Sequence, residues 1–183
     1  MKRQILIYLV LFLFACKSET KGLDFGQFTI EVPKTWNKIE RNGVDSYVGE
    51  ISIDNNDTIY FDLGWYSNDL TDELPYIIEE GNVHLVNLKK SKPGHSFYDY
   101  YGKADTVDLK KFLKNEYKYD TIDNKKAKIV KPKVPGNGIT GVFFDSLWVS
   151  GSGIDRLQLS GYNLKELNQQ KVLMAIKTIK FRK

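Results

Sequence analysis

Cysteine and histidine are almost absent from this chain of 183 residues, which contains one Cys and two His. A single Cys can form neither an internal disulfide nor a Cys-rich zinc site, and two His cannot complete a three-His site. An excess of charge of one sign is also lacking, because 27 Lys and Arg face 23 Asp and Glu. We therefore expect no cofactor and no nucleic-acid partner. The 42% hydrophobic and 27% charged residues are typical of a globular protein.

No apolar run is long enough to cross a bilayer as a helix, which takes about 20 residues. The uncharged run at residues 5–14 instead follows two basic residues and precedes Ala15, the layout of a secretory signal. Residues 13–16 (Leu-Phe-Ala-Cys) match the lipobox of bacterial lipoproteins, in which the Cys thiol forms a thioether to lipid and the Cys becomes the first residue of the mature chain. We predict a signal peptide over residues 1–15 and lipidation of Cys16.

The predicted anchor places the chain in the bacterial cell envelope, attached to a membrane through lipid. Polar residues follow Cys16, and we expect residues 16–24 to form a flexible tether. Lys17 favours the outer membrane, by analogy with the sorting of enterobacterial lipoproteins. The remainder, residues 25–183, is long enough for one domain with its own core and carries a variable insertion around residues 70–115.

Alternation of apolar and polar residues predicts antiparallel strands at residues 27–32, 46–53, 58–66, 126–130 and 140–149. Residues 140–149 are apolar on both faces, which is typical of a central strand covered on both sides. Gly81-Asn82 signals a hairpin, and a helix over residues 70–80 is the alternative, which Pro75 disfavours.

Two helices are expected. Asp105 and Asp108 precede an apolar segment that would end as a helix near Asn115, and Asn163 with Glu166 forms a capping box before a C-terminal amphipathic stripe. Antiparallel strands with flanking helices define an α+β fold.

Catalytic motifs are weak. Residues 136–141 fit G-x-G-x-x-G, but Pro135 precedes them and a strand follows, so they predict a turn and not a phosphate loop. His84 and His95 have carboxylates at helical spacing but lie in predicted strand or loop, and we expect them to be exposed. Residues 54–58 lack the glycine and glutamate of a calcium loop and predict a hairpin turn.

Aromatic residues provide the remaining signal for a site. Tyrosine and tryptophan give large contact areas at low entropic cost, and those that could line a ligand-binding groove are Trp65, Tyr66, Tyr98, Tyr100, Tyr101 and Trp148. The alternative is that most of them belong to the core or to cross-strand pairs.

The segment Phe28-x-Ile30-x-x-Pro33-x-x-Trp36 resembles the opening of PsbP-like and Mog1-like domains, and residues 176–181 resemble their close. With the lipobox, the chain is similar to small lipoproteins of the Bacteroidetes type. The resemblance implies an α/β/α sandwich, an antiparallel sheet flanked by helices. It implies no catalytic residues, because such domains act mainly as binding or accessory modules.

These observations predict a non-enzymatic, lipid-anchored binding or accessory module whose partner is another envelope protein or a glycan. The alternative is an envelope hydrolase acting on glycan or peptide, with an aromatic cleft and with Asp62, Asp99 or Asp145 as acid or base. A lipoprotein that binds a soluble ligand or neutralises a toxin is a third hypothesis.

Overall fold

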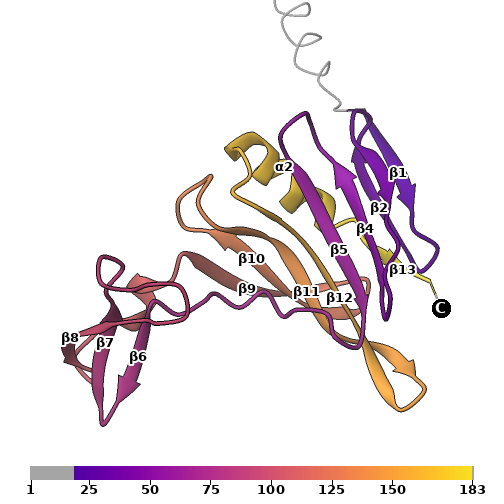
Figure 1. Ribbon diagram of the computed structural model, residues 1–183. Coiled ribbons are helices and arrows are strands. Elements are labelled where there is room, and N and C mark those ends of the chain that lie inside the picture. The colour runs from indigo at the N-terminus through magenta and orange to yellow at the C-terminus, as the bar shows by residue number, and fades with distance from the viewer. Residues whose placement is uncertain (1–18, 183) are drawn as a thin grey trace, which may run out of the picture.

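Antiparallel β-sheet dominates the protein, as shown by a computed structural model that describes residues 19–182 (Figure 1). Strands account for 52% of the structure and helical segments for 9%. The predicted α+β sandwich flanked by helices is therefore wrong, and the fold is β-rich. The predicted signal peptide and Cys16 lie outside the described residues. Within the described part of the chain, no helix has the length and apolar character needed to cross a membrane.

The largest element is an antiparallel sheet of seven strands. In spatial order they are β3 (Asn37–Glu40), β4 (Tyr47–Ser52), β5 (Thr58–Gly64), β12 (Gly153–Tyr162), β11 (Ile139–Ser150), β10 (Lys125–Pro132) and β9 (Asn115–Ile122). The predicted two-sided apolar strand is β11, which pairs with β12 on one side and β10 on the other. Its central place is confirmed, and the alternation predicted for β5 is confirmed as well, because Ile59, Phe61 and Leu63 are buried on one face.

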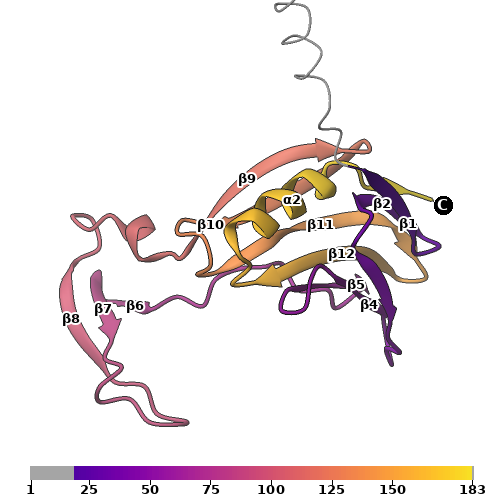
Figure 2. The ribbon, with the colours of Figure 1, turned by 90° about the horizontal axis from the view of Figure 1, so that it is seen from above.

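A second sheet and one helix cover the inner face of the large sheet (Figure 2). The second sheet contains β1 (Thr20–Asp24), β2 (Phe28–Pro33) and β13 (Lys180–Phe181), and the helix is α2 (Glu166–Ile176). Residues 20–24, which were expected in the tether, thus form a strand. The main core lies between these layers, and its largest fully buried side chains include Trp36, Phe28 and Phe144.

The second predicted helix is reduced to one short turn, η2 (Leu109–Phe112), capped by the Asp108 side chain. An isolated helix of fewer than about 12 residues is marginal without tertiary packing, and no η2 residue is buried. At Asn115 the chain enters β9, where pairing with β10 and burial of the Asn115 side chain favour a strand over a helix. Asn115 is only 1% exposed, and its backbone N–H donates to Asp72 at 3.1 Å.

The outer face of the large sheet carries a smaller apolar cluster. Leu70, from the segment that leaves β5, packs there against Val130, Ile139 and Phe143. Lys128 Nζ on β10 donates to the backbone oxygen of Asp69 at 2.9 Å, which holds the segment against the sheet. We call residues 67–75 the strap, because they cross from β5 to the far side of the molecule.

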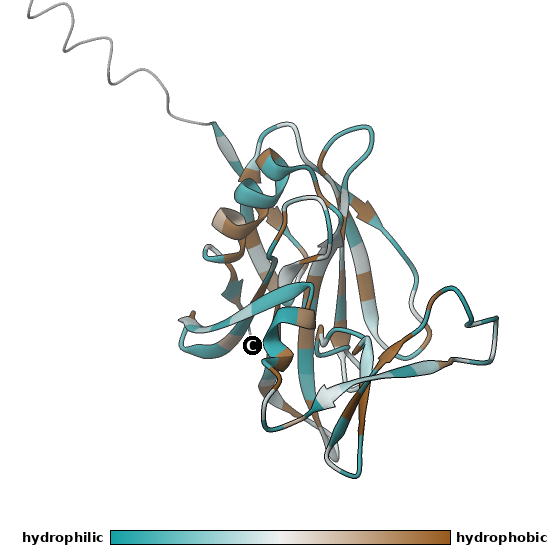
Figure 3. Ribbon diagram, turned by 90° about the vertical axis from the view of Figure 1, so that its left-hand side faces the viewer, coloured by the Kyte–Doolittle hydropathy of each residue, from teal (hydrophilic) through white to brown (hydrophobic). Residues whose placement is uncertain are grey.

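The strap leads into a third sheet that projects from the body (Figure 1). It contains β6 (Tyr76–Glu79), β7 (Asn82–Val86) and β8 (Tyr98–Lys103). The predicted hairpin at Gly81 is confirmed, since Glu80 and Gly81 both have positive φ angles, of 49° and 77°. The alternative helix over residues 70–80 does not form. Figure 3, which views the molecule from this side, shows hydrophobic stretches along this small sheet.

Candidate functional site: a groove on the inner face

A groove of about 1070 Å³ opens at one end of the inner face. The loop between β3 and β4, residues 41–46, forms one wall, and Trp65 and Tyr66, directly after β5, form another. Its floor consists of inward-facing positions on β4 and β5, among them Tyr47 and Phe61. The groove exists because the small second sheet and α2 leave this end of the large sheet uncovered.

Trp65 is held in place as part of the wall. Its indole lies over Gly153, where a Cβ atom would come within 2.5 Å of the ring, so that only glycine allows this position. Arg156 Nη1 on β12 donates to the Trp65 backbone oxygen at 3.1 Å. The side chain remains 40% exposed. A fixed, half-exposed indole is a preformed platform, which reduces the conformational entropy lost on binding.

On the floor of the groove, as at Trp65, a glycine makes room for an aromatic ring. Gly49 of β4 leaves room for the Phe61 ring, because a Cβ at Gly49 would approach that ring within 2.4 Å. Tyr47 packs edge-on against Phe61 with ring centroids 5.2 Å apart. Tyr47 therefore contributes a packed aromatic ring to the lining of the groove, as is typical of ligand pockets.

Both basic side chains that line the groove are already paired with carboxylates. Arg41 forms a two-point contact with Glu50, at 2.7 and 3.0 Å, and this contact raises the pKa of the arginine. Lys38 Nζ lies 3.2 Å from Glu40. Asp155 accepts a hydrogen bond of 2.7 Å from the Trp148 indole. A groove with aromatic walls and without an unpaired basic side chain in its lining suits a neutral polar ligand better than an anionic one.

The structure brings some of the predicted aromatic residues together and separates the others. Trp65 and Tyr66 line the groove, and Trp148 is linked to its wall through Asp155. The other three lie on β8 in the projecting sheet, outside the groove: Tyr98, Tyr100 and Tyr101.

None of the three carboxylates considered as acid or base lines the groove. Asp62 faces the outer side of the large sheet opposite Gln158, and its Oδ1 has no hydrogen-bond partner within residues 19–182. Asp145 borders a hollow of about 140 Å³ on the outer face. Asp99 is on β8, where hydrogen bonds from Asn87 and then Lys90 lower its pKa. A carboxyl with a lowered pKa is ionised at neutral pH and cannot act as a general acid there.

Both histidines belong to the projecting sheet. His84 packs edge-on against Tyr100, with 5.9 Å between ring centroids, and His95 forms a backbone bridge with Lys92 in the loop before β8. In the part of the chain that the structure describes, no group of three or more His, Cys, Asp or Glu side chains could hold a metal ion.

Sequence reasoning missed Tyr47, the loop at residues 41–46 and Asp155. Tyr47 could have been found from alternation, since Tyr47, Gly49 and Ile51 share the inward face of one strand. The loop has the composition of an ordinary turn, and no sequence signal indicates that it forms the wall of a groove.

Comparison with protein families, with curated proteins and with solved structures finds no match for this chain. What characterises the protein is therefore its own fold and site: a β-rich body with an aromatic groove and a projecting three-stranded sheet.

Proposed function

We propose that this protein is a lipid-anchored binding module of the bacterial cell envelope, and that its groove binds an uncharged glycan. The observation that carries the ligand class is the fixed, half-exposed Trp65 beside a tyrosine and paired polar groups. A sugar ring has an apolar face that can stack on an indole and a rim of hydroxyls that hydrogen-bond to polar side chains. A peptide is the competing ligand of similar polarity.

Support for the anchor comes from the lipobox at residues 13–16, and Lys17 favours the outer membrane. Several acyl chains would give stable attachment, because each buried methylene contributes about 0.8 kcal/mol. An envelope hydrolase is the alternative, but the carboxylates considered for it, Asp62, Asp99 and Asp145, do not line the groove.

Binding is tested by titrating the purified full chain with neutral oligosaccharides and with peptides while tryptophan fluorescence is recorded. We expect saturable binding of an oligosaccharide, and we expect Trp65→Ala to weaken it at least tenfold, about 1.4 kcal/mol. Gly153→Ala should weaken it too, because the added Cβ displaces the indole, whereas Gly22→Ala, with no atom within 4 Å of its Cβ position, is the matched control.

Two results would contradict the proposal. Binding of peptides alone would reassign the ligand class. Equal affinity in the wild type and the Trp65→Ala variant would remove the groove as the site. The anchor is tested separately by mass spectrometry of the N-terminal peptide, where an unmodified Cys16 would refute lipidation.

A further inference from the structure

The projecting sheet leaves most of its large hydrophobic side chains exposed or half-buried. Val83 is the one fully buried side chain on β6, β7 and β8. Large hydrophobic residues stand exposed on these strands and around them: Leu74, Ile77, Ile78, Leu88, Phe97, Tyr98, Tyr100 and Tyr101. Contiguous exposed apolar patches in a soluble body mark interaction surfaces.

The two faces of this sheet differ. Phe112 of η2 covers one face, with its ring centroid 5.9 Å from that of Tyr76 and 5.1 Å from that of Tyr101. On the other face, Ile77, His84 and Tyr100 are register neighbours across the three strands. Ile77 and Tyr100 are exposed there, so this face has no cover within the described residues.

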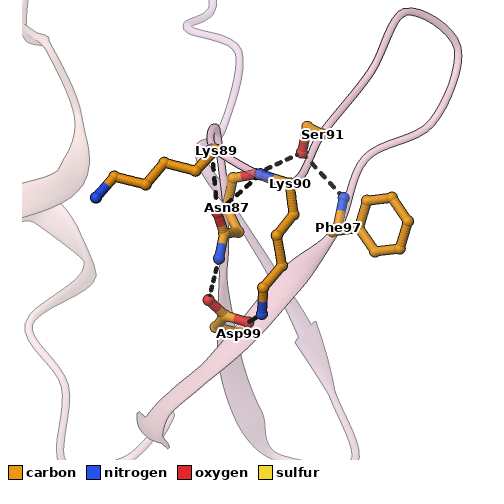
Figure 4. A network of polar contacts seen from close by, with 6 residues as sticks. All are labelled: Asn87, Lys89, Lys90, Ser91, Phe97 and Asp99. Atoms are coloured by element: carbon orange, nitrogen blue, oxygen red, sulfur yellow. Dashed lines mark hydrogen bonds and ion pairs between the residues drawn. The ribbon is translucent and has the colours of Figure 1, made fainter.

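The loop between β7 and β8, residues 87–97, extends this apolar surface and has a defined shape (Figure 4). The Asn87 side-chain oxygen accepts from the backbone N–H groups of Lys89 and Lys90, at 3.0 and 3.1 Å. Ser91 Oγ donates to the Asn87 backbone oxygen and accepts from the Phe97 N–H, at 2.8 and 3.0 Å. This network keeps Leu88 84% exposed and Phe97 50% exposed.

The same loop is basic. Lys89, Lys90 and Lys92 lie within it, and it contains no Asp or Glu. Lys90 pairs with Asp99 at 3.3 Å, while Lys89 and Lys92 form no ion pair with any carboxylate in residues 19–182. Two lysines without an ion pair in residues 19–182 therefore lie in the same loop as an exposed leucine.

We propose that this loop docks on a bilayer surface that carries anionic lipid headgroups. Leu88 and Phe97 enter the boundary between headgroups and acyl chains, Tyr98 lies at headgroup level, and Lys89 and Lys92 contact lipid phosphates. Membrane interfaces favour this combination of apolar, tyrosine and lysine side chains. The cores of protein–protein interfaces are instead depleted in lysine, and on this ground a bilayer fits the loop better than a protein partner.

This contact is independent of the groove and of Cys16. An acyl chain attaches a protein without setting the direction in which the body points. A second contact through the loop would fix that orientation and thereby the direction in which the groove faces.

The test uses the full chain bound to vesicles, with an environment-sensitive fluorophore attached at Leu88→Cys. The matched control carries the fluorophore at Val149→Cys, an exposed residue of the hairpin between β11 and β12. Cys16 is present in both chains, so any label on it contributes equally. Vesicles are made of phosphatidylcholine alone or of phosphatidylcholine mixed with phosphatidylglycerol.

We expect the label at position 88 to shift to the blue and to be quenched by lipid-borne quenchers only on the vesicles that contain phosphatidylglycerol. High salt should reverse the shift. Lys89→Gln with Lys92→Gln should weaken the response by about fivefold per lysine, whereas Lys171→Gln with Lys177→Gln on and after α2 should not.

A label at position 88 that remains in water on both vesicles overturns the proposal. A shift of equal size on both vesicles also overturns it, because anionic lipid would then play no part. A shift that occurs without vesicles and grows with protein concentration would assign the surface to a second copy of the chain.

Discussion

Asp57 caps a helix that begins more than a hundred residues further along the chain. Its Oδ2 accepts from the backbone N–H of Lys165 at 3.1 Å and from Asn168 Nδ2 at 2.7 Å. The capping box predicted from Asn163 and Glu166 is wrong. Asn163 has a φ angle of 52° and accepts instead from the Gly138 N–H, and α2 starts at Glu166 without a side-chain cap of its own.

Replacing this distant cap should destabilise the fold. Asp57 is 9% exposed, and Asp57→Ala leaves the Lys165 backbone N–H at the start of α2 without its acceptor. It also removes one of the two carboxylates that accept from the buried Asn168, the other being Asp54. We expect the free energy of unfolding in urea to fall by about 1–3 kcal/mol. Asp105→Ala, at an exposed position, is the control. Equal stability of the two variants would show that the cap contributes nothing.

Asp54 makes stability depend on pH. Hydrogen bonds from the Asn56 backbone, the Asn168 side chain and the Asp57 backbone lower its pKa well below the ordinary 3.8. A lowered pKa in the folded state means that the stabilisation is present above the unfolded pKa and is lost as pH falls through the folded value.

We therefore expect the wild type to lose more stability between neutral pH and pH values below about 4 than Asp54→Asn does. The asparagine can still accept the two backbone bonds of the turn but does not titrate. Urea unfolding at both pH values provides the measurement, and identical losses in the two proteins would rule out the role assigned to Asp54.

At the scale of elements, the strap decides how the projecting sheet is connected to the body. Leu70 anchors it in the outer cluster, and the Tyr117 hydroxyl accepts from the Asp72 N–H at 3.2 Å. Burial raises the pKa of Tyr117, in keeping with its place beneath the strap.

Truncating the Leu70 side chain should weaken the packing of the strap against the large sheet. Leu70 is 1% exposed, and we expect Leu70→Ala to lower the free energy of unfolding by about 2–5 kcal/mol. Leu74→Ala, on the same segment but 52% exposed, should change it by less than about 0.5 kcal/mol. If calorimetry or urea unfolding gave similar losses for both, the outer cluster would not be a stabilising core.

At the scale of the whole molecule, stability should be uneven. The projecting sheet buries one side chain completely, while β11 and β12 form the centre of the main core. We expect amide hydrogens of β7 to exchange with deuterium faster than those of β11 and β12, because local opening of the small sheet exposes little apolar surface. Equal protection across the two sheets would contradict this picture.

Elements were predicted correctly where their sequence pattern depends only on residues close to one another along the chain. The strands at β2, β4, β5, β10 and β11 were predictable because alternation along a strand reports burial directly. The C-terminal helix was also predictable, but its buried face was only partly so. Leu167 is 62% exposed, while Asn168 and Gln169 are buried. For Asn168 the reason is that the loop containing Asp54 and Asp57 offers polar partners that the helix sequence cannot reveal.

The candidate site was predictable only in part for the same reason. Trp65 and Tyr66 were identified by residue type, yet Tyr98 and Tyr100 have the same chemistry and lie on another sheet. The residue type indicates that an aromatic side chain can contact a ligand. Which aromatic side chains line the same groove depends on pairings between strands that are far apart along the chain.

The amino-acid sequence by itself determined the lipobox, the positions of five strands and of the hairpin at Gly81, and the kind of side chain available for binding, because each depends on neighbours a few residues away. Tertiary structure alone decided that the fold is β-rich, that Asp57 caps α2 and that the groove forms beside Trp65. These features arise where distant segments meet, and the free energy of such contacts comes from burial and hydrogen bonds that no local pattern records.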